Sequence, residues 1–307
     1  MSPFLKFWKK KTVTTLTDNP SQSKSQNEDY WTGHNVTKHK YFQTTKESLE
    51  YFDWRNDQYF NYLNLMPVVD FDNQVILDYG CGPGHDLIGF GIYSRPLKLI
   101  GMDISKSSLA EAQERCNLHG LRPLLIHCND PEAKIPQENE SIDHIHCSGV
   151  LHHIPDFKKI LREFKRILKP EGSINLMVYN RNSIWYHLYV AFILPFRNNF
   201  FPELSLSERF AKSTDGPECP SSFCHTPEEW LDHFRDAGFD ARFRGAAVSM
   251  TEAGVLSARF DAIQDLRLSS ESRKFLLALE FDSAGFPIVK GHYAGIDACF
   301  QLRHTNQ

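Results

Sequence analysis

Short apolar runs alternate with amphipathic stretches through the middle of the chain. Five runs have the length and composition of buried strands, and the stretches between them carry apolar residues at helical spacing. The strands are expected at residues 75–79, 98–103, 124–128, 142–147 and 173–179, and the helices at 86–93, 107–119 and 156–168. Strands separated by helices of this length predict a parallel, doubly wound α/β sheet. Ligands of such sheets bind at the carboxyl ends of the strands, so the residues after each strand are the candidate site residues.

The pattern continues beyond this core. Residues 240–249 read as a sixth strand, and residues 295–304 alternate well enough to form an antiparallel last strand. Helical patterns cover 48–65, 226–237, 252–266 and 271–281, whereas 169–172 read as a tight turn. The fold predicted is therefore an α/β sheet of about seven strands, mostly parallel, with a helical amino-terminal lid and an inserted segment.

Five segments follow from this pattern. They are a flexible leader (1–28), a helical lid (29–66), an α/β core (67–182), an inserted substrate-facing region with a helix (183–237), and carboxyl-terminal strands and helices that complete the sheet (238–307). Residues 183–196 are almost continuously apolar but too short to span a bilayer.

Composition narrows the class of protein. With 41% hydrophobic residues and a net charge of −4 in 307 residues, the chain is expected to be globular, with no nucleic-acid partner. The seven cysteines form no regular disulfide framework, which favours a reducing, cytoplasmic location. No apolar run is long enough to insert stably into a membrane, and residues 1–11 lack the pattern of a signal peptide.

A glycine turn follows the first core strand. Gly80, Gly82 and Gly84 stand at alternate positions, two residues after Asp78. Glycines let backbone N–H groups approach a ligand closely, and the carboxylate suits a ligand that carries an ammonium group better than a diphosphate. S-adenosylmethionine, whose amino acid end has one ammonium and one carboxylate, is the cofactor that this turn indicates.

The glycine turn and the strands around it resemble those of a known protein family. Between residues 75 and 179 the chain resembles the class I S-adenosylmethionine-dependent methyltransferases, a Rossmann-like superfamily that includes small-molecule and quinone methylases. The resemblance implies that the turn, including Cys81, holds the methionine end of the cofactor. The further cofactor candidates are Asp103, Ile104, Asn129, Asp130 and Ser148 within this stretch, together with Arg55 of the predicted lid.

Two of these assignments have structural alternatives. Asp103 ends the second strand and can accept both ribose hydroxyls, but it is also placed to cap the following helix. Asn129 and Asp130 follow the third strand, where family members often bind the adenine amino group, yet with Pro131 they also make an ordinary turn.

Histidines follow the fourth strand. His152 and His153 lie in a Leu-His-His segment that family members place near the reacting end of the cofactor. A hydroxyl acceptor has to lose a proton, and a histidine suits that task, so either residue is a candidate catalytic base. The alternative is that both histidines only shape the loop and the cofactor pocket.

The remaining candidates would contact the acceptor. They are Trp31, Asn35 and Tyr59 in the lid, Tyr179, Asn180 and Arg181 after the fifth strand, and His292 near the last one. The alternative for the aromatic residues of the lid is that they only pack against the core. No metal is expected, because Cys219, Cys224 and His225 offer only three ligands without the usual C-x-x-C spacing.

The function predicted is transfer of a methyl group from S-adenosylmethionine to a small molecule, first to a hydroxyl of a sugar or another small metabolite. A carbon or nitrogen acceptor on a quinone-like compound or natural product is the alternative. A non-catalytic S-adenosylmethionine-binding protein and a nicotinamide-dependent oxidoreductase are the rivals from other classes. The sequence leaves the oligomeric state open.

Overall fold

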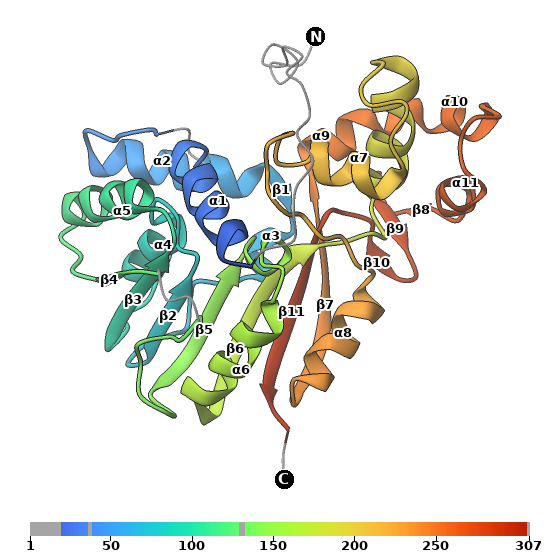
Figure 1. Cartoon of the computed structure of the whole chain (residues 1–307). Helices are drawn as coiled ribbons and strands as arrows, with labels where there is room; N and C mark the ends of the chain where they lie inside the picture. The colour runs from blue at the N-terminus through green and yellow to red at the C-terminus, as the bar shows by residue number, and fades with distance from the viewer. Residues whose placement is uncertain (1–19, 36–38, 129–132, 306–307) are drawn as a thin grey trace.

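The computed structural model describes residues 20–35, 39–128 and 133–305 (Figure 1). Its centre is an eight-stranded sheet in the order β1-β7-β11-β6-β5-β2-β3-β4. The strands are β1 (Tyr59–Phe60), β2 (Val75–Tyr79), β3 (Lys98–Asp103), β4 (Leu124–His127), β5 (Ile142–Ser148), β6 (Leu168–Tyr179), β7 (Phe239–Ser249) and β11 (Asp297–His304).

The sheet confirms the predicted topology. Strands β2 to β6 pair in parallel, and β11 pairs antiparallel with both β6 and β7. The eighth strand, β1, adds two residues antiparallel to β7 at the edge. Because the five core strands run the same way, their carboxyl ends share one edge, at the top of Figure 1.

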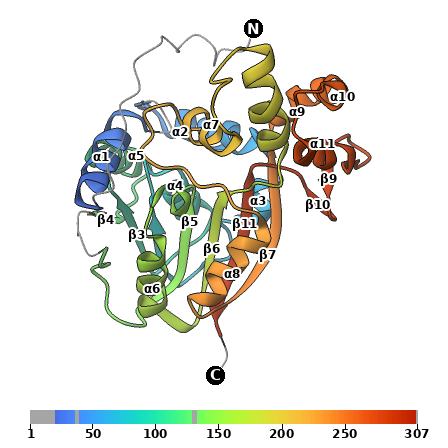
Figure 2. The ribbon, with the colours of Figure 1, turned by 45° about the vertical axis from the view of Figure 1, so that its right-hand side comes forward.

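Helices cover both faces of the sheet. Alternate residues of a strand point to opposite faces, so Leu77 packs in one hydrophobic cluster and Ile76 in another. The first cluster is completed by α6 (Phe157–Ile167) and α8 (Pro227–Asp236), which Figures 1 and 2 show on the same face. The second cluster is completed by α2 (Thr45–Asp57), α4 (His85–Tyr93) and α5 (Lys106–Leu118).

A group of short helices lies beyond the carboxyl edge and is called the cap below. It consists of η3 (Trp185–Arg197), α7 (Leu206–Ser213), α9 (Met250–Val255), η4 (Leu256–Ala258), α10 (Arg259–Gln264) and α11 (Ser270–Leu277). The apolar segment η3 is a π-helix with its own buried cluster against α10 and α11. A small sheet of β8 (Glu280–Phe281), β9 (Pro287–Val289) and β10 (His292–Tyr293) follows it.

One buried carboxylate fixes the cap to the sheet. Glu252 accepts hydrogen bonds from the backbone N–H groups of Trp185 (3.0 Å) and Ile296 (3.2 Å), so it joins the start of η3 to the segment before β11. Its capping box with Ser249 also begins α9. The single helix expected at 252–266 is therefore wrong, because this capping starts a separate six-residue helix that η4 and α10 follow.

The amino-terminal segment differs from the prediction in two places. Helix α1 (Pro20–Gly33) begins within the stretch expected to be a flexible leader up to residue 28. The helix has almost no apolar face, and polar contacts such as that of Glu28 with His127 (3.1 Å) attach it to the core. The helix expected at 48–65 is interrupted because Asn61 adopts a left-handed φ of 71°, which separates α2 from α3 (Tyr62–Leu65).

The turn predicted at 169–172 is also corrected. Strand β6 already begins at Leu168, which pairs with Ile142 of β5, and the register shifts before His144 pairs with Ser173. The Pro-Glu-Gly segment is accommodated as an irregularity within a long strand, because β5 supplies it with a pairing edge. Among the described residues, no helix is both long and apolar enough to cross a bilayer.

Candidate active site at the carboxyl edge of the sheet

The glycine turn after β2 has the backbone that its sequence predicts. Gly80, Gly82 and Gly84 have φ values of 80°, 51° and 77°, which residues with a side chain rarely adopt. A Cβ on Gly80 would lie 2.1 Å from Val150 Cγ2, whereas a Cβ on Gly82 would meet no atom of the described part of the chain within 4 Å. The turn is therefore closed on the side of β5 and open at Gly82.

Asp78 lies beneath this turn at the end of β2. It is 2% exposed, and its Oδ2 has no hydrogen-bond partner in the described structure. Burial raises the pKa of Asp78 to about 8, and the neighbouring His146 opposes this shift. A buried carboxylate oxygen without a donor is costly, so Asp78 is arranged to receive a donor or positive charge from a ligand.

Asp103 connects the turn to the next strand. Its Oδ2 accepts the backbone N–H of Gly82, and its Oδ1 accepts that of Ser105, both at 2.8 Å. Ser105, rather than Asp103, caps α5 by accepting the N–H of Ser108, so the alternative role of Asp103 as the helix cap is wrong. Each Asp103 oxygen keeps a second lone pair for a ligand hydroxyl.

Several buried or partly buried ionisable side chains lie near Asp78. The sequence indicated Arg55 among them, but neither His146 nor Asp86. His146 of β5 faces Asp86 of α4 with 3.3 Å between Nε2 and Oδ2. Burial alone raises the pKa of Asp86, but the hydrogen bond from His146 lowers it below its usual range. Arg55 of α2 adds a positive charge to this group and stacks on Tyr62, whose hydroxyl contacts Ser148 Oγ at 2.5 Å.

The two candidate histidines have different surroundings. Both lie in the short helix η2 (Leu151–His153) after β5. His152 is fully buried and stacks on the Tyr179 ring at 3.7 Å, and neither of its nitrogens has a hydrogen-bond partner among the described residues. Burial lowers the pKa of His152 well below its usual value, so this ring stays neutral and packs against Tyr179.

His153 is instead held by polar atoms. Its Nδ1 lies 2.8 Å from the carbonyl oxygen of Ser221, and since a carbonyl only accepts, Nδ1 carries the proton. The lone pair is then on Nε2, which lies 3.8 Å from Asp215 Oδ2. Of the two histidines, His153 therefore has the nitrogen that can act on a ligand.

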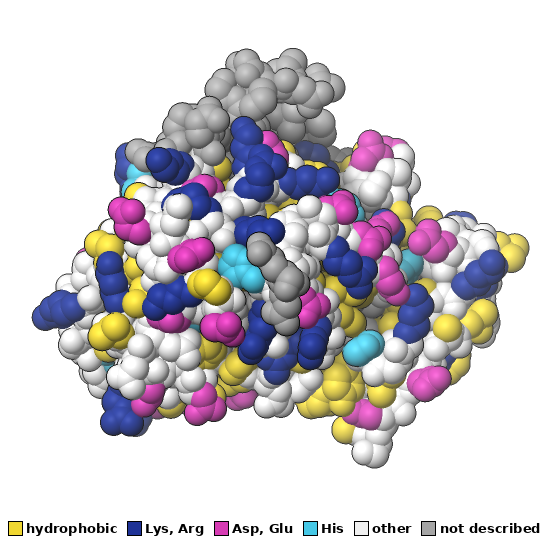
Figure 3. All heavy atoms as spheres, turned by 90° about the horizontal axis from the view of Figure 1, so that it is seen from below, with side chains coloured by type: hydrophobic (Ala, Val, Ile, Leu, Met, Phe, Trp, Pro, Cys, Tyr) yellow, Lys and Arg dark blue, Asp and Glu magenta, His cyan; other side chains and the backbone are white. Residues whose placement is uncertain are grey.

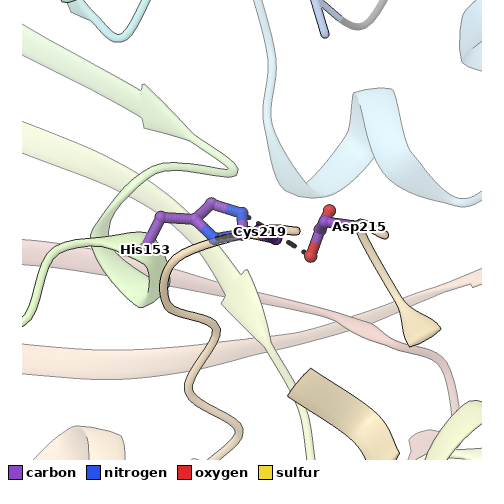
Figure 4. Close-up of side chains that lie close together, drawn as sticks. All are labelled: His153, Asp215 and Cys219. Atoms are coloured by element: carbon purple, nitrogen blue, oxygen red, sulfur yellow. Dashed lines mark hydrogen bonds and ion pairs between the residues drawn. The ribbon is translucent and has the colours of Figure 1, made fainter. Parts of the chain in front are cut away.

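Asp215 and Cys219 complete this part of the site (Figure 4). Both come from the irregular segment after α7, where sequence reasoning found no pattern for Asp215. The Tyr179 hydroxyl donates to Asp215 Oδ1 at 2.7 Å, and the Ser222 hydroxyl donates to Oδ2 at 3.3 Å. Cys219 Sγ lies 3.8 Å from His153 Nδ1. The segment thus brings a carboxylate and a thiol to the histidine.

Helix α1 closes the site from the amino-terminal side. The Trp31 ring packs 4.9 Å from the His153 ring, and the Tyr30 hydroxyl donates to the backbone carbonyl of Asp215. The Ser107 hydroxyl donates to the Thr32 carbonyl at 2.8 Å, which ties the helix to α5. One end of α1 therefore contacts both the cofactor half and the acceptor half of the edge.

Other candidates lie elsewhere or offer less than expected. Asn35 donates to Glu111 of α5 at 2.8 Å, and the guanidinium of Arg181 contacts Glu229 at 2.5 Å. Asn180 and His292 line a separate surface cleft of about 190 Å³ beside the start of α8. The structure does not bring these four residues to His153.

Three further cofactor candidates already contact other parts of the protein. The Cys81 side chain is buried in a core cluster, so only its backbone faces the turn. The Ile104 carbonyl lies 2.9 Å from His127 Nε2, and Ser148 contacts Tyr62 as described above. Asn129 and Asp130 lie outside the described residues.

Tyr59 and Asp297 extend the site toward β7. Tyr59 of β1 stacks with the Arg55 guanidinium, whose centre is 5.4 Å from the ring. Asp297, the first residue of β11, pairs with Tyr179 of β6, is 3% exposed, and makes no side-chain hydrogen bond to the described residues. Burial raises its pKa to about 8, and the nearby Glu252 adds to the shift.

The opposite, amino edge of the sheet carries a mixed surface. Figure 3 views the molecule from below, where basic and acidic side chains are interspersed over the surface. Asp78, with its unpartnered buried oxygen, and the cluster of His153, Asp215 and Cys219 both lie at the carboxyl edge, which is therefore the candidate active site.

Comparisons with known proteins identify the family of the chain. A family model described as "Methyltransferase domain" matches residues 70–235, which is more than half of the chain. Demethylmenaquinone methyltransferase of Oceanobacillus iheyensis is 28% identical over 178 residues, covering 54% of this chain and 70% of the relative. Ubiquinone biosynthesis O-methyltransferase of Idiomarina loihiensis is 34% identical over 110 residues, but the match covers only 35% of this chain and 43% of the relative.

The fold also has a solved counterpart. The crystal structure of the YcgJ protein from Bacillus subtilis superposes with a TM-score of 0.50 at 17% identity, covering 79% of this chain and 97% of that one. At this identity the likeness concerns the fold alone.

Proposed function

Because the chain belongs to the methyltransferase domain family and is an S-adenosylmethionine-dependent enzyme, we propose that it methylates a hydroxyl group of a small-molecule acceptor. When bound, S-adenosylmethionine supplies a methyl group on a positively charged sulfur, which is open to attack by a nucleophile. The chain itself has to hold the cofactor, align the acceptor, exclude water and assist the loss of the hydroxyl proton.

The residues around the glycine turn fit this cofactor. Asp78 has an unpartnered buried oxygen suited to an ammonium group, and the open space at Gly82 lets the backbone approach a ligand. Asp103 is already oriented by Gly82 and Ser105, with lone pairs left for ribose hydroxyls. We assign Arg55 to the cofactor carboxylate, because its positive charge lies close to Asp86 and Tyr62 beneath the turn.

His153 and Asp215 support the hydroxyl acceptor, and their arrangement is the observation on which the proposal rests. The Ser221 carbonyl fixes the proton on Nδ1, so Nε2 presents a lone pair beside the Asp215 carboxylate. This arrangement stabilises positive charge at Nε2, as loss of the acceptor proton requires. His152, by contrast, is assigned to packing against Tyr179.

The surroundings of His153 favour a flat acceptor. Trp31 and Tyr179 pack against the two histidines, and both rings offer large surfaces at little entropic cost. An aromatic hydroxyl fits such walls and ionises more readily than a sugar hydroxyl. The names of the quinone-pathway relatives point the same way, and they keep carbon methylation of a quinone-like ring as the alternative.

The test is transfer of a deuterated methyl group. The purified full chain would be incubated with methyl-labelled S-adenosylmethionine and a panel of hydroquinones, catechols, sugars, amines and ring-carbon acceptors. We expect S-adenosylhomocysteine release and label on oxygen, with His153→Gln lowering kcat at least ten-fold. His225→Gln, a change in the same region outside the cluster, is the matched control. Label found only on carbon or nitrogen, or no transfer to any hydroxyl, would overturn the proposal.

A further inference from the structure

We propose that His153, Asp215 and Cys219 form a binding site for one divalent cation, with Zn²⁺ as the preferred ion. Each of the three side chains offers one ligand atom, and these atoms all lie within 4.8 Å of one another (Figure 4). Among the described residues, these three form the group of His, Cys, Asp or Glu side chains whose ligand atoms lie this close together. Cys224 and His225, which the sequence placed beside Cys219 as possible ligands, do not belong to it.

The spacing suits a small cation after slight closure. Zinc binds nitrogen, oxygen and sulfur at about 2.0–2.3 Å, which places neighbouring tetrahedral ligands roughly 3.3–3.8 Å apart. The distance from His153 Nε2 to Asp215 Oδ2 is already 3.8 Å. The side chains have to approach by no more than about 1 Å to reach this geometry.

Hydrogen bonds around the cluster orient the ligands as a metal site requires. A metal-binding histidine usually donates its other N–H to a carbonyl or carboxylate, and His153 does so to Ser221. The carboxylate ligand is normally held by a hydrogen bond as well, and Asp215 accepts the hydroxyl protons of Tyr179 and Ser222. The arrangement therefore presents a histidine lone pair and a fixed carboxylate oxygen to the same point.

The chemical types of the three ligands determine which ion the site prefers. One imidazole, one carboxylate and one thiolate favour Zn²⁺ over Mg²⁺ or Ca²⁺, which bind mainly through oxygen. Cys219 is 3% exposed and its thiol points toward the Ser221 carbonyl at 3.4 Å, so it would lose its proton on binding the cation. Three protein ligands leave a fourth position open, as in catalytic zinc sites.

The role of the cation rests on the proposed function. An acceptor hydroxyl in the open position would have its pKa lowered by the cation, and its proton would pass to water while the oxygen keeps the electron pair. His153 and Asp215 would then assist loss of the proton by holding the cation. The cation is thus the means by which His153 and Asp215 act on the acceptor.

Binding of Co²⁺ tests the site without any methyl transfer. Chelator-treated full chain would be titrated with Co²⁺, whose absorption reports tetrahedral geometry and, through a charge-transfer band, a cysteine ligand. We expect one ion per chain, displaced by Zn²⁺. Cys219→Ser should abolish the charge-transfer band, and Asp215→Asn should weaken binding at least ten-fold.

Cys224→Ser is the matched control, because it removes a neighbouring, partly buried thiol outside the cluster and should leave the band unchanged. Calorimetric binding of S-adenosylhomocysteine by each variant would show that the fold is intact. Absence of stoichiometric binding, or a charge-transfer band that persists in Cys219→Ser, would overturn the metal site. Hydroxyl methylation that survives chelation would overturn the role of the cation while leaving the proposed function standing. Metal binding without any hydroxyl methylation would overturn the proposed function while leaving the metal site standing.

Discussion

The backbone N–H of Gly82 donates to the carboxylate of Asp103 at 2.8 Å, so the glycine turn after one strand is held by the acid that ends the next. Because β2 and β3 pair in parallel, this bond ties together the two strand ends that would hold the cofactor. A change at Asp103 therefore affects both a ligand contact and the shape of the turn.

Asp103→Ala should weaken S-adenosylmethionine binding by about 1–3 kcal/mol, because ribose hydroxyls and the Gly82 N–H both lose a charged acceptor. Isothermal titration calorimetry measures this directly. Asp143→Ala is a suitable control, since that acid lies at the far end of the sheet and binds Lys169. Unchanged affinity in Asp103→Ala would contradict the ribose assignment.

Gly80→Ala should destabilise the fold by roughly 1–3 kcal/mol, because alanine is strained at a φ of 80° and its Cβ would overlap Val150 Cγ2. Adding Val150→Ala should recover part of the loss, which separates the steric cost from the backbone cost. Urea unfolding of the single and double variants provides the measurement. Equal stability of Gly80→Ala and the wild type would mean that the turn is built differently.

Trp31→Ala should raise the acceptor KM several-fold with a smaller effect on cofactor affinity, because this ring packs against His153 rather than against the glycine turn. Trp54→Ala, which removes an exposed tryptophan from α2, serves as the comparison. The prediction fails if Trp31→Ala impairs cofactor binding as strongly as acceptor turnover.

Asp297 should make stability depend on pH. Its pKa is raised from 3.8 to about 8, so between pH about 4 and about 8 the folded chain binds more protons at this group than the unfolded chain. Stability should therefore fall as pH rises through this window and level off above it, by a few kcal/mol at most. Asp297→Asn should flatten this part of the profile, as followed by denaturant unfolding at several pH values. A parallel decline in both proteins would assign the effect to Asp78 or Glu252 instead.

The core of the fold was predictable because its signals are local. The first two strands have the predicted bounds, and the capping box of Thr226 starts α8 where the sequence indicates. Apolar runs and caps depend on neighbouring residues, so the sequence carries them directly. The acids Asp78 and Asp103 could be singled out for the same reason, since Asp78 is the last but one residue of its strand and Asp103 is the last of its own.

The acceptor side of the site depends on contacts between distant segments, which no local pattern contains. Asp215 lies in an irregular stretch and reaches His153 only because α7 and η3 place that stretch over β6. Helix α1 has no apolar stripe that would indicate its packing, and it is attached by polar contacts together with the rings of Tyr30 and Trp31. The pairing of His146 with Asp86 could not be read from the sequence because the two residues are 60 positions apart, on a strand and a helix that meet only in the fold.

The position of β11 between β6 and β7 has a consequence for biosynthesis. During translation, β6 and β7 emerge well before the strand that has to separate them, so β7 has no central partner until residues 297–304 leave the ribosome. The half of the sheet that carries the glycine turn can form while the chain is still being made, but the sheet can close only afterwards. A nascent chain stalled before residue 297 would thus expose two strand edges at once, and it would be a natural substrate for chaperones.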